Sequence, residues 1–304
     1  GVLTREAGFY FYFSRKIREL RESGHEGTAR AYASSLRSMQ RYLGKKDFPF
    51  IKLSSRIISD YQGKLLASGI CDNTIGFYLH NIKALFRKGC REMGLELPCP
   101  FRDISIKTKK TLKRSLDPVV IKTLSAIELE KDSPLSLARD IFMFSFYTRG
   151  MSFVDIALLK KRHVFPGEIC YRRHKTDQLM RVGINKEISR ILERYKNVPG
   201  EYIFPLFPAE RDPYAGYRNA YHRIRYSLGK ISRVIGLEFP LRLHAARHSW
   251  ATIAKVNGAS VHVIGECLGH TSEKTTRIYL KELDHSALDA VNNQVADFIL
   301  AVDD

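Results

Sequence analysis

Apolar residues recur at helical spacing through the first third of the chain. From Tyr10 to about Glu96 they return every three or four positions, as at Tyr32, Leu36 and Met39. This spacing places apolar side chains on one face of an α-helix, which can then pack against other helices. The first hundred residues are therefore expected to form an all-helical domain.

Apolar periodicity stops after this helical part. The following stretch holds prolines and closely spaced basic residues, among them Lys107, Lys109 and Lys110, a composition typical of an extended connector. A basic connector between two basic domains could close around a duplex, although a merely solvated connector has the same composition. We therefore divide the chain into a helical domain, a basic linker and a second domain, over residues 1–100, 101–117 and 118–304.

The second domain begins with helical patterns and then changes period. Apolar spacing predicts helices over 120–129 and 135–147, and helices again from Ser189 onward. Between them, short alternating runs surround a Pro-Gly turn, which indicates antiparallel strands. The sequence predicts a mainly α fold with one small antiparallel sheet, whose strands lie within 163–165, 168–175 and 178–184.

Positive charge is spread along most of the chain. Fifty Lys and Arg against thirty-two Asp and Glu give a formal net charge of +18, which favours a polyanionic partner such as nucleic acid. A ribosomal protein or a membrane-surface protein could have the same balance. Basic positions on the predicted N-terminal helices are candidates for phosphate contacts, although a solvated face explains any one of them equally well: Arg30, Arg37, Arg41, Lys83 and Arg87.

The cysteines and the hydropathy limit other classes of protein. The five cysteines are scattered without CxxC spacing, so neither a thiolate metal site nor a disulfide framework is expected. No apolar stretch approaches the length of a membrane span, and we expect a cytoplasmic protein without a membrane partner. The chain begins at Gly1 instead of Met, which leaves open whether its natural N-terminus lies upstream.

Three short motifs in the last quarter carry the chemistry. They are His244-Ala-Ala-Arg247, then Leu-Gly-His270, then Arg-Ile-Tyr279. His244 and Arg247 share a helix face, and a guanidinium fork beside an imidazole suits a phosphate. Tyr279 alone, between two apolar neighbours, would be interpreted as a core aromatic. The order and spacing of the three motifs resemble the catalytic signature of the tyrosine recombinase, or phage integrase, family.

The resemblance implies both a fold and a reaction. The family combines a helical SAM-like core-binding domain with a mixed α/β catalytic domain. By resemblance, Tyr279 is the nucleophile that forms a 3′-phosphotyrosine, and Arg247, His244 and His270 bind and stabilise the phosphoryl group. Lys175, in a predicted β-turn, occupies the place of the family's general acid for the leaving 5′-oxygen. The resemblance implies neither a metal nor another cofactor.

One position departs from the family pattern. The family has an arginine three residues before an acidic residue that begins a helix. Here Asp155 fits the acidic position, which puts the arginine position on Ser152. Either Arg173 or Arg149 could replace the missing cation. We favour Arg173, because alternation with Lys175 on an extended strand would project both side chains from one face. This arginine-poor pattern resembles the integrases of Bacteroides-type mobile elements.

The resemblance also implies partners and leaves alternatives. Double-stranded DNA with inverted-repeat core sites is the expected substrate, and recombination would integrate, excise or invert it through a Holliday junction. The amphipathic tail over 286–304 would dock on a neighbouring subunit to form a homotetramer on DNA, or pack on its own domain, and the free protein could be monomeric. The alternatives are a type IB topoisomerase, a catalytically silent DNA-binding regulator, and a basic structural or RNA-associated protein.

Overall fold

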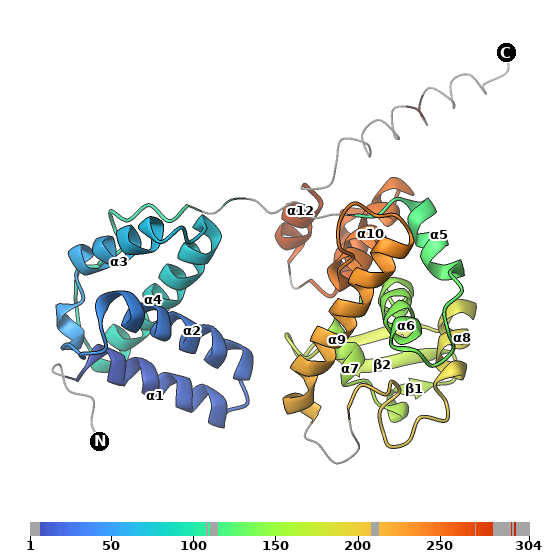
Figure 1. Ribbon diagram of the computed structural model, residues 1–304, viewed down its shortest axis with the longest axis horizontal. Helices are drawn as coiled ribbons and strands as arrows, with labels where there is room; N and C mark the ends of the chain where they lie inside the picture. The colour runs from blue at the N-terminus through green and yellow to red at the C-terminus, as the bar shows by residue number, and fades with distance from the viewer. Residues whose placement is uncertain are drawn as a thin grey trace. The chain divides into compact units, whose positions relative to one another are not determined.

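The chain folds as two units (Figure 1), and each unit has its own hydrophobic core. They are Gly1–Thr111, called unit 1, and Leu112–Asp304, called unit 2, and the division lies within the predicted linker. This computed structural model describes residues 7–107, 109, 115–207, 213–270, 272–281, 293 and 295, except for the side chains of 213–215, 278, 279 and 281. Lys110 and nearly all of the tail over 286–304 lie outside the described residues.

Unit 1 is helical in its described part, as the apolar spacing predicts. Its helices pack their apolar faces on one core that is rich in aromatic rings. Phe50 stacks on Phe86 with ring centroids 5.5 Å apart, and Gly89 leaves room for the Phe50 ring, since a Cβ there would lie 2.5 Å from it. The elements are α1 (Phe9–Glu22), α2 (Glu26–Leu43), the 3₁₀ turn η1 (Phe50–Lys52), α3 (Ser55–Ala67) and α4 (Asp72–Met93).

A distant carboxylate fixes the start of the first helix. The Asp47 side chain accepts hydrogen bonds from the backbone N–H groups of Tyr10 (2.8 Å) and Phe11 (3.0 Å). These N–H groups have no partner within a helix, and a carboxylate at a helix N-terminus also complements the helix dipole. The loop between α2 and η1 is thereby tied to α1.

Unit 2 combines helices with a three-stranded antiparallel sheet of order β1-β2-β3, in which buried and more exposed residues alternate along β2 and β3. In the register, Tyr171 of β2 lies opposite Met180 of β3. The elements before α8 are α5 (Pro118–Ala126), α6 (Pro134–Tyr147), α7 (Phe153–Ala157), η2 (Lys161–His163), β1 (Val164–Phe165), β2 (Glu168–Arg172) and β3 (Leu179–Gly183). After them come α8 (Lys186–Arg194), α9 (Pro213–Val234), α10 (Leu243–Val256), α11 (Val261–Leu268) and α12 (Glu273–Lys281).

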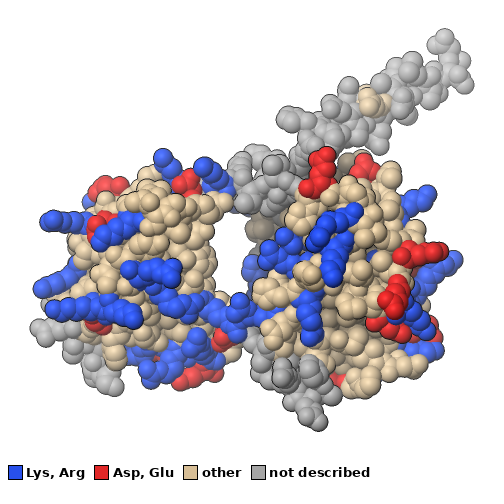
Figure 2. Space-filling model, in the orientation of Figure 1, with Lys and Arg blue, Asp and Glu red and all other residues tan. Residues whose placement is uncertain are grey.

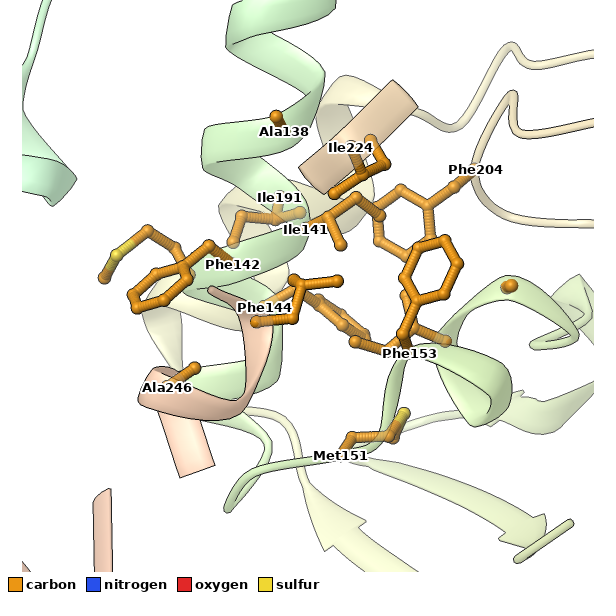
Figure 3. Packing of buried hydrophobic residues seen from close by; sticks show 14 of the residues in the cluster. Ala138, Ile141, Phe142, Phe144, Met151, Phe153, Ile191, Phe204, Ile224 and Ala246 are labelled. Atoms are coloured by element: carbon orange, nitrogen blue, oxygen red, sulfur yellow. The ribbon is translucent and has the colours of Figure 1, made fainter. Parts of the chain in front are cut away.

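Helix α6 is the centre of the unit 2 core (Figure 3). Its Ile141, Phe142 and Phe144 are fully buried, and Phe144 meets the edge of Phe204 at 5.1 Å between ring centroids. Ala246 of α10 is also fully buried in this cluster. Burial on more than one face explains why α6 is apolar nearly all round, and it anchors α10, the helix that carries the HxxR motif.

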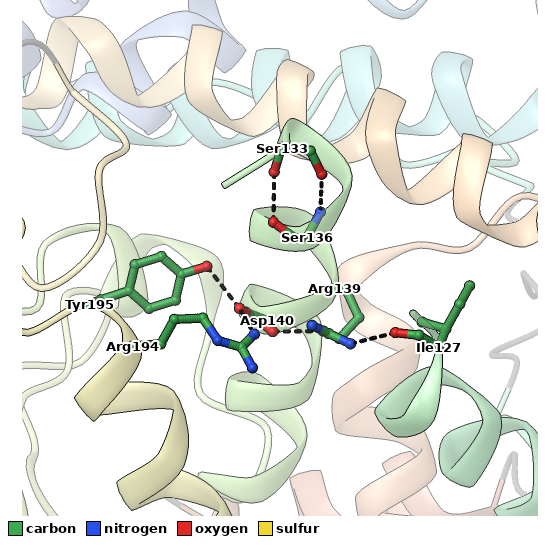
Figure 4. A network of polar contacts seen from close by, with 7 residues as sticks. All are labelled: Ile127, Ser133, Ser136, Arg139, Asp140, Arg194 and Tyr195. Atoms are coloured by element: carbon green, nitrogen blue, oxygen red, sulfur yellow. Dashed lines mark hydrogen bonds and ion pairs between the residues drawn. The ribbon is translucent and has the colours of Figure 1, made fainter. Parts of the chain in front are cut away.

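One acidic side chain inside this core is fully paired (Figure 4). The Asp140 carboxylate, 2% exposed, accepts hydrogen bonds from Arg139 Nε (2.6 Å), Arg194 Nη1 (2.5 Å) and Tyr195 Oη (2.8 Å). Arg139 also donates to the carbonyl of Ile127 (2.9 Å). A buried carboxylate is tolerated when cationic donors surround it, and here it links α6 to the end of α8.

The predicted mainly α fold with a small antiparallel sheet is confirmed, but one expectation about the hairpin is wrong. Arg173 and Lys175 do not alternate on a strand, because β2 ends at Arg172 and residues 174–176 form a turn. The chain reverses direction between Arg173 and Gln178, where the backbone N–H of Arg173 donates to the carbonyl of Gln178 (2.9 Å). Lys175 therefore lies in the hairpin turn, as its predicted place in a β-turn requires.

Candidate active site

The guanidinium of Arg247 is held by carbonyl groups from two other segments. Arg247, on α10, donates from Nη1 to the carbonyl of Gly150 (2.9 Å) and from Nη2 to the carbonyl of Leu268 (2.6 Å). The same Nη2 lies 3.2 Å from Nε2 of His270. Gly150 has φ +75° and packs so closely that a Cβ would lie 2.5 Å from Cγ of Arg247. The structure thus brings together two of the motifs predicted from the sequence.

Arg173 reaches the same turn from the sheet. Its Nη1 donates a short hydrogen bond to the carbonyl of Gly269, the residue after the Leu268 carbonyl that Arg247 binds. Gly269 has φ +61°, and a Cβ there would lie 2.9 Å from Met180 Sδ and 3.2 Å from Arg173 Nη1. Two guanidinium groups therefore bind consecutive carbonyls directly before His270.

The imidazole of His270 joins this cluster to α12. Its Nδ1 lies 2.9 Å from Oγ1 of Thr276, a residue of α12 whose side chain is fully buried. Tyr279 lies one helical turn further along α12, and its side chain is outside the described residues. The fold thus positions the backbone of the predicted nucleophile on the helix that contacts His270.

His244 lies one turn before Arg247 on α10. Its ring keeps access to solvent, and its centroid is 6.3 Å from that of His248. Partial burial, and secondly the charge of Arg247, lower the pKa of His244 below its usual value. The ring is therefore neutral at pH 7 and able to accept a proton.

Lys175 is exposed at the tip of the hairpin between β2 and β3. Asp155, 4% exposed, holds the base of this turn, because its Oδ1 accepts a hydrogen bond from the backbone N–H of His174 (2.8 Å). The other carboxylate oxygen accepts from the Ser152 hydroxyl (2.6 Å). The acidic position noted in the sequence therefore fastens the hairpin turn to α7.

Ser152 and Arg149 both make contacts near the start of α7 and the sheet. Ser152 caps the N-terminus of α7, where its Oγ accepts from the backbone N–H of Asp155 (3.4 Å). Arg149 adopts φ +61°, unusual for a residue with a side chain, and its Nη1 lies 3.5 Å from the carbonyl of Arg181. Arg149 thus contacts the sheet, whereas Arg173 contacts the turn before His270.

The charges of three arginines act on the buried phenol of Tyr171. Tyr171 of β2 is 6% exposed, and burial, then the charge of Asp155, raise its pKa above the usual value. The charges of Arg173, Arg247 and Arg149 act in the opposite direction. All three arginines are therefore near enough to Tyr171 to affect its ionisation, and the site concentrates positive charge beside β2.

The basic candidates of unit 1 differ in their surroundings, and Lys and Arg are prominent on the face of the unit shown in Figure 2. Arg30 is paired with Glu26 (2.7 Å), Lys83 lies 6.0 Å above the ring of Phe101, and Lys109 is paired with Asp72 (3.2 Å). The other described candidates are exposed to solvent: Arg37, Arg41, Arg87 and Lys107. Arg37 and Arg41 border one hollow together with Lys45.

Two features are absent from the part of the chain that the structure describes. No group of three or more His, Cys, Asp or Glu side chains is arranged to hold a metal ion in this part of the chain. No helix there is long and apolar enough to cross a membrane.

Two family models match the chain, one in each unit. The chain matches the model of the phage integrase family over residues 115–285 and that of the phage integrase SAM-like domain over residues 8–102. It belongs to the phage integrase family, whose members are tyrosine recombinases.

Curated relatives are distant but cover most of the chain. Tyrosine recombinase XerC of Shewanella oneidensis is 26% identical over 226 residues, which are 71% of this chain and 70% of the relative. Tyrosine recombinase XerD of Pseudomonas putida is 24% identical over 262 residues, 84% of this chain and 86% of the relative. The similarity thus extends over both units.

Solved structures share the fold at low sequence identity. A lambda integrase dimer bound to a core site superposes with a TM-score of 0.66 at 16% identity, covering 90% of this chain and 95% of that one. The Tn1549 transposon integrase with a circular intermediate DNA gives a TM-score of 0.67 at 15% identity, covering 96% and 99%. At such low sequence identity, these similarities show a shared fold.

Proposed function

We propose that the protein is a site-specific recombinase in which Tyr279 attacks a DNA backbone phosphate and Arg247, Arg173 and His270 bind that phosphate. The observation that carries the assignment of the cations is the pair of guanidinium groups on the consecutive carbonyls of Leu268 and Gly269. Both lie beside His270. Membership of the family supports the proposed reaction, and this geometry supports the assignment of the cationic residues.

Charge explains why the site needs several cations. A phosphodiester is anionic, and its pentavalent transition state gathers still more negative charge, so preorganised cationic donors supply much of the rate acceleration. Arg247 and Arg173 now donate to backbone carbonyls, which holds both guanidinium groups in place before DNA binds. A guanidinium has five N–H donors in a fixed fork, so one group can donate to a carbonyl and to a phosphate oxygen at the same time.

The proposed step balances without a cofactor. The Tyr279 oxygen bonds to phosphorus as the bond from phosphorus to the 5′-oxygen breaks, which leaves a 3′-phosphotyrosine and a free 5′-hydroxyl. His244, neutral because of its lowered pKa, accepts the tyrosine proton. Lys175 donates a proton to the leaving 5′-oxygen. The phosphotyrosine keeps the energy of the broken diester, so a 5′-hydroxyl from another strand reverses the step.

The proposed substrate is double-stranded DNA with inverted-repeat core sites. The exposed basic side chains Arg37, Arg41, Arg87 and Lys107 would contact its backbone, with Arg30, Lys83, Lys109 and Lys110 as further candidates. The tail over 286–304 would dock on a neighbouring subunit and close a tetramer, in which two DNA sites exchange strands through a Holliday junction.

The test of the function is a covalent adduct that depends on Tyr279. The full chain is incubated with fragmented DNA of its source organism and denatured, and the DNA that stays attached is sequenced. We expect one recurring site for the wild type and no adduct for Tyr279→Phe, which keeps the ring and removes the nucleophile. A wild type without any adduct, or a Phe variant that still forms one, would contradict the proposal.

The recovered site then separates recombination from simple strand cleavage. Two duplexes carrying the site are incubated with the protein, and branched DNA is resolved on a native gel. We expect a Holliday intermediate and exchanged products. Relaxation of supercoiled DNA without a branched intermediate would instead indicate a type IB topoisomerase.

A second test assigns the replacement for the missing arginine. On a suicide duplex with the recovered site, Arg173→Ala should abolish single-turnover cleavage and leave site binding nearly unchanged, because it removes a cation from the transition state. Arg149→Ala is the matched control and should retain cleavage. Loss of cleavage with Arg149→Ala and its retention with Arg173→Ala would reverse the assignment.

A further inference from the structure

Thr276 is a polar residue at a buried junction of three segments. Its side chain is fully buried, and its Oγ1 lies 2.9 Å from Nδ1 of His270. It also covers Gly265 of α11, where a Cβ would lie 2.7 Å from Oγ1. The carbonyl of Gly265 in turn accepts the backbone N–H of His270 (3.0 Å). The hydroxyl therefore lies where α11, α12 and the His270 turn meet.

The partners of His270 define the hydrogen position on its ring. Nε2 lies 3.2 Å from Nη2 of Arg247, and a guanidinium nitrogen can only donate. In this contact Nε2 is the acceptor, so the hydrogen of a neutral ring is on Nδ1. That N–H points to Oγ1 of Thr276, which accepts it.

Phosphate binding requires Nε2 of His270 to be a donor instead of an acceptor. A phosphate oxygen only accepts, so His270 must carry a hydrogen on Nε2 to bind one. In the neutral ring this moves the proton from Nδ1 to Nε2 through solvent, and Nδ1 then needs a donor. A hydroxyl both donates and accepts, so rotation of the Thr276 O–H supplies that donor without movement of α12.

We propose that Thr276 is the positioning residue of His270: its hydroxyl accepts from Nδ1 in the free protein and donates to Nδ1 when Nε2 binds the scissile phosphate. The inference rests on the proposed role of His270 in recombination. Because Thr276 is one helical turn before Tyr279 on α12, the same hydrogen bond ties the nucleophile's helix to the phosphate site. Leu280, 3% exposed, packs α12 on Ala251, Ile264 and Leu268 beside it.

Two single substitutions separate the hydroxyl from the methyl group. Thr276→Val keeps the shape and removes the hydroxyl, and Thr276→Ser keeps the hydroxyl and removes the methyl. On the suicide duplex we expect Val to slow cleavage about tenfold, the factor for one neutral hydrogen bond, and Ser to stay within about twofold of wild type. Equal rates for Val and wild type, or a larger loss for Ser than for Val, would overturn the proposal.

A measurement on the DNA-free chain reports the hydrogen position directly. Long-range ¹H–¹⁵N spectra distinguish Nδ1–H from Nε2–H imidazole, and the His270 signals are identified by their disappearance in His270→Gln. We expect Nδ1–H in the wild type and in Thr276→Ser, and a reduced Nδ1–H fraction in Thr276→Val. An unchanged Nδ1–H fraction in Val would show that the hydroxyl does not set it.

A double-mutant comparison excludes a merely structural effect. In the His270→Gln background, Thr276→Val should not slow cleavage further, because the hydroxyl acts through the imidazole. A further tenfold loss there would refute the role. If Val disturbs folding, as judged by its unfolding transition, Ser against Ala gives the same comparison, since these differ only by the hydroxyl. The ¹H–¹⁵N spectra of the DNA-free chain do not depend on recombination. If no covalent DNA adduct forms, the proposed function is refuted, but the spectra still test the hydrogen bond of Thr276.

Discussion

Replacing Gly150 by alanine tests whether the close approach of Gly150 positions Arg247. Gly150 has φ +75°, and a Cβ there would lie 2.5 Å from Cγ, 2.7 Å from Cβ and 2.9 Å from Cα of Arg247. The last of these atoms belongs to the backbone of α10, so the clash cannot be relieved by a side-chain rotation alone. Gly258 offers a matched control, because it has φ +84° and nothing within 4 Å of its Cβ position.

The magnitude follows from two contributions. The left-handed conformation costs a residue with a Cβ about 1–2 kcal/mol, and this cost is common to both variants. Overpacking against Arg247 adds about 1–3 kcal/mol in Gly150→Ala alone. The expected loss in the free energy of unfolding is therefore about 2–5 kcal/mol for Gly150→Ala and about 1–2 kcal/mol for Gly258→Ala. A shift of α10 by about 1 Å would also slow cleavage about a hundredfold.

Denaturant unfolding and single-turnover cleavage of the suicide duplex measure the two effects. Both variants should be folded at 20 °C, roughly the temperature at which such domains are most stable, and only Gly150→Ala should cleave slowly. If Gly150→Ala cleaves as fast as Gly258→Ala, the close approach of Gly150 does not position Arg247 and the reasoning is refuted.

Two further predictions concern the proton acceptor and the core. Because the pKa of His244 is lowered from its usual 6.5, the ring stays neutral above that pH. The rate of cleavage should not change with pH above 6.5, and it should fall as the pH drops through the lowered pKa of His244. If the rate of His244→Gln still falls in the same acid range, His244 is not the base. Asp140→Ala removes the carboxylate that pairs with the largely buried Arg139, so the free energy of unfolding in denaturant titrations should fall by about 3 kcal/mol. Cleavage by the folded fraction should be unchanged, and a stability loss below about 0.5 kcal/mol would show that the buried pairs contribute little.

Much of the local structure follows from the sequence, because it depends on neighbours along the chain. The apolar spacing predicts the helices of unit 1 and helix α6, and the Pro-Gly turn predicts the β1–β2 hairpin. The order and spacing of the three motifs around Arg247, His270 and Tyr279 predict the family. Tyr279 took its assignment from these motifs alone, and it remains a proposal.

Tertiary structure decided which residues surround the proposed phosphate site. The sequence suggested Arg173 through strand alternation, and that reason is wrong, because the strand ends one residue earlier. Arg173 instead reaches the Gly269 carbonyl, a contact across the fold that periodicity cannot reveal.

Gly150 and Thr276 carried no signal of their role in the sequence. A glycine before a helix and a threonine within one are common, and their importance appears only through what they touch, Arg247 and His270. Local spacing along the chain fixes secondary structure, whereas the positions of charges from distant segments depend on how the units fold. The sequence by itself therefore determined the family, because it contains most of the family's motifs. The tertiary structure decided how the cations are held together.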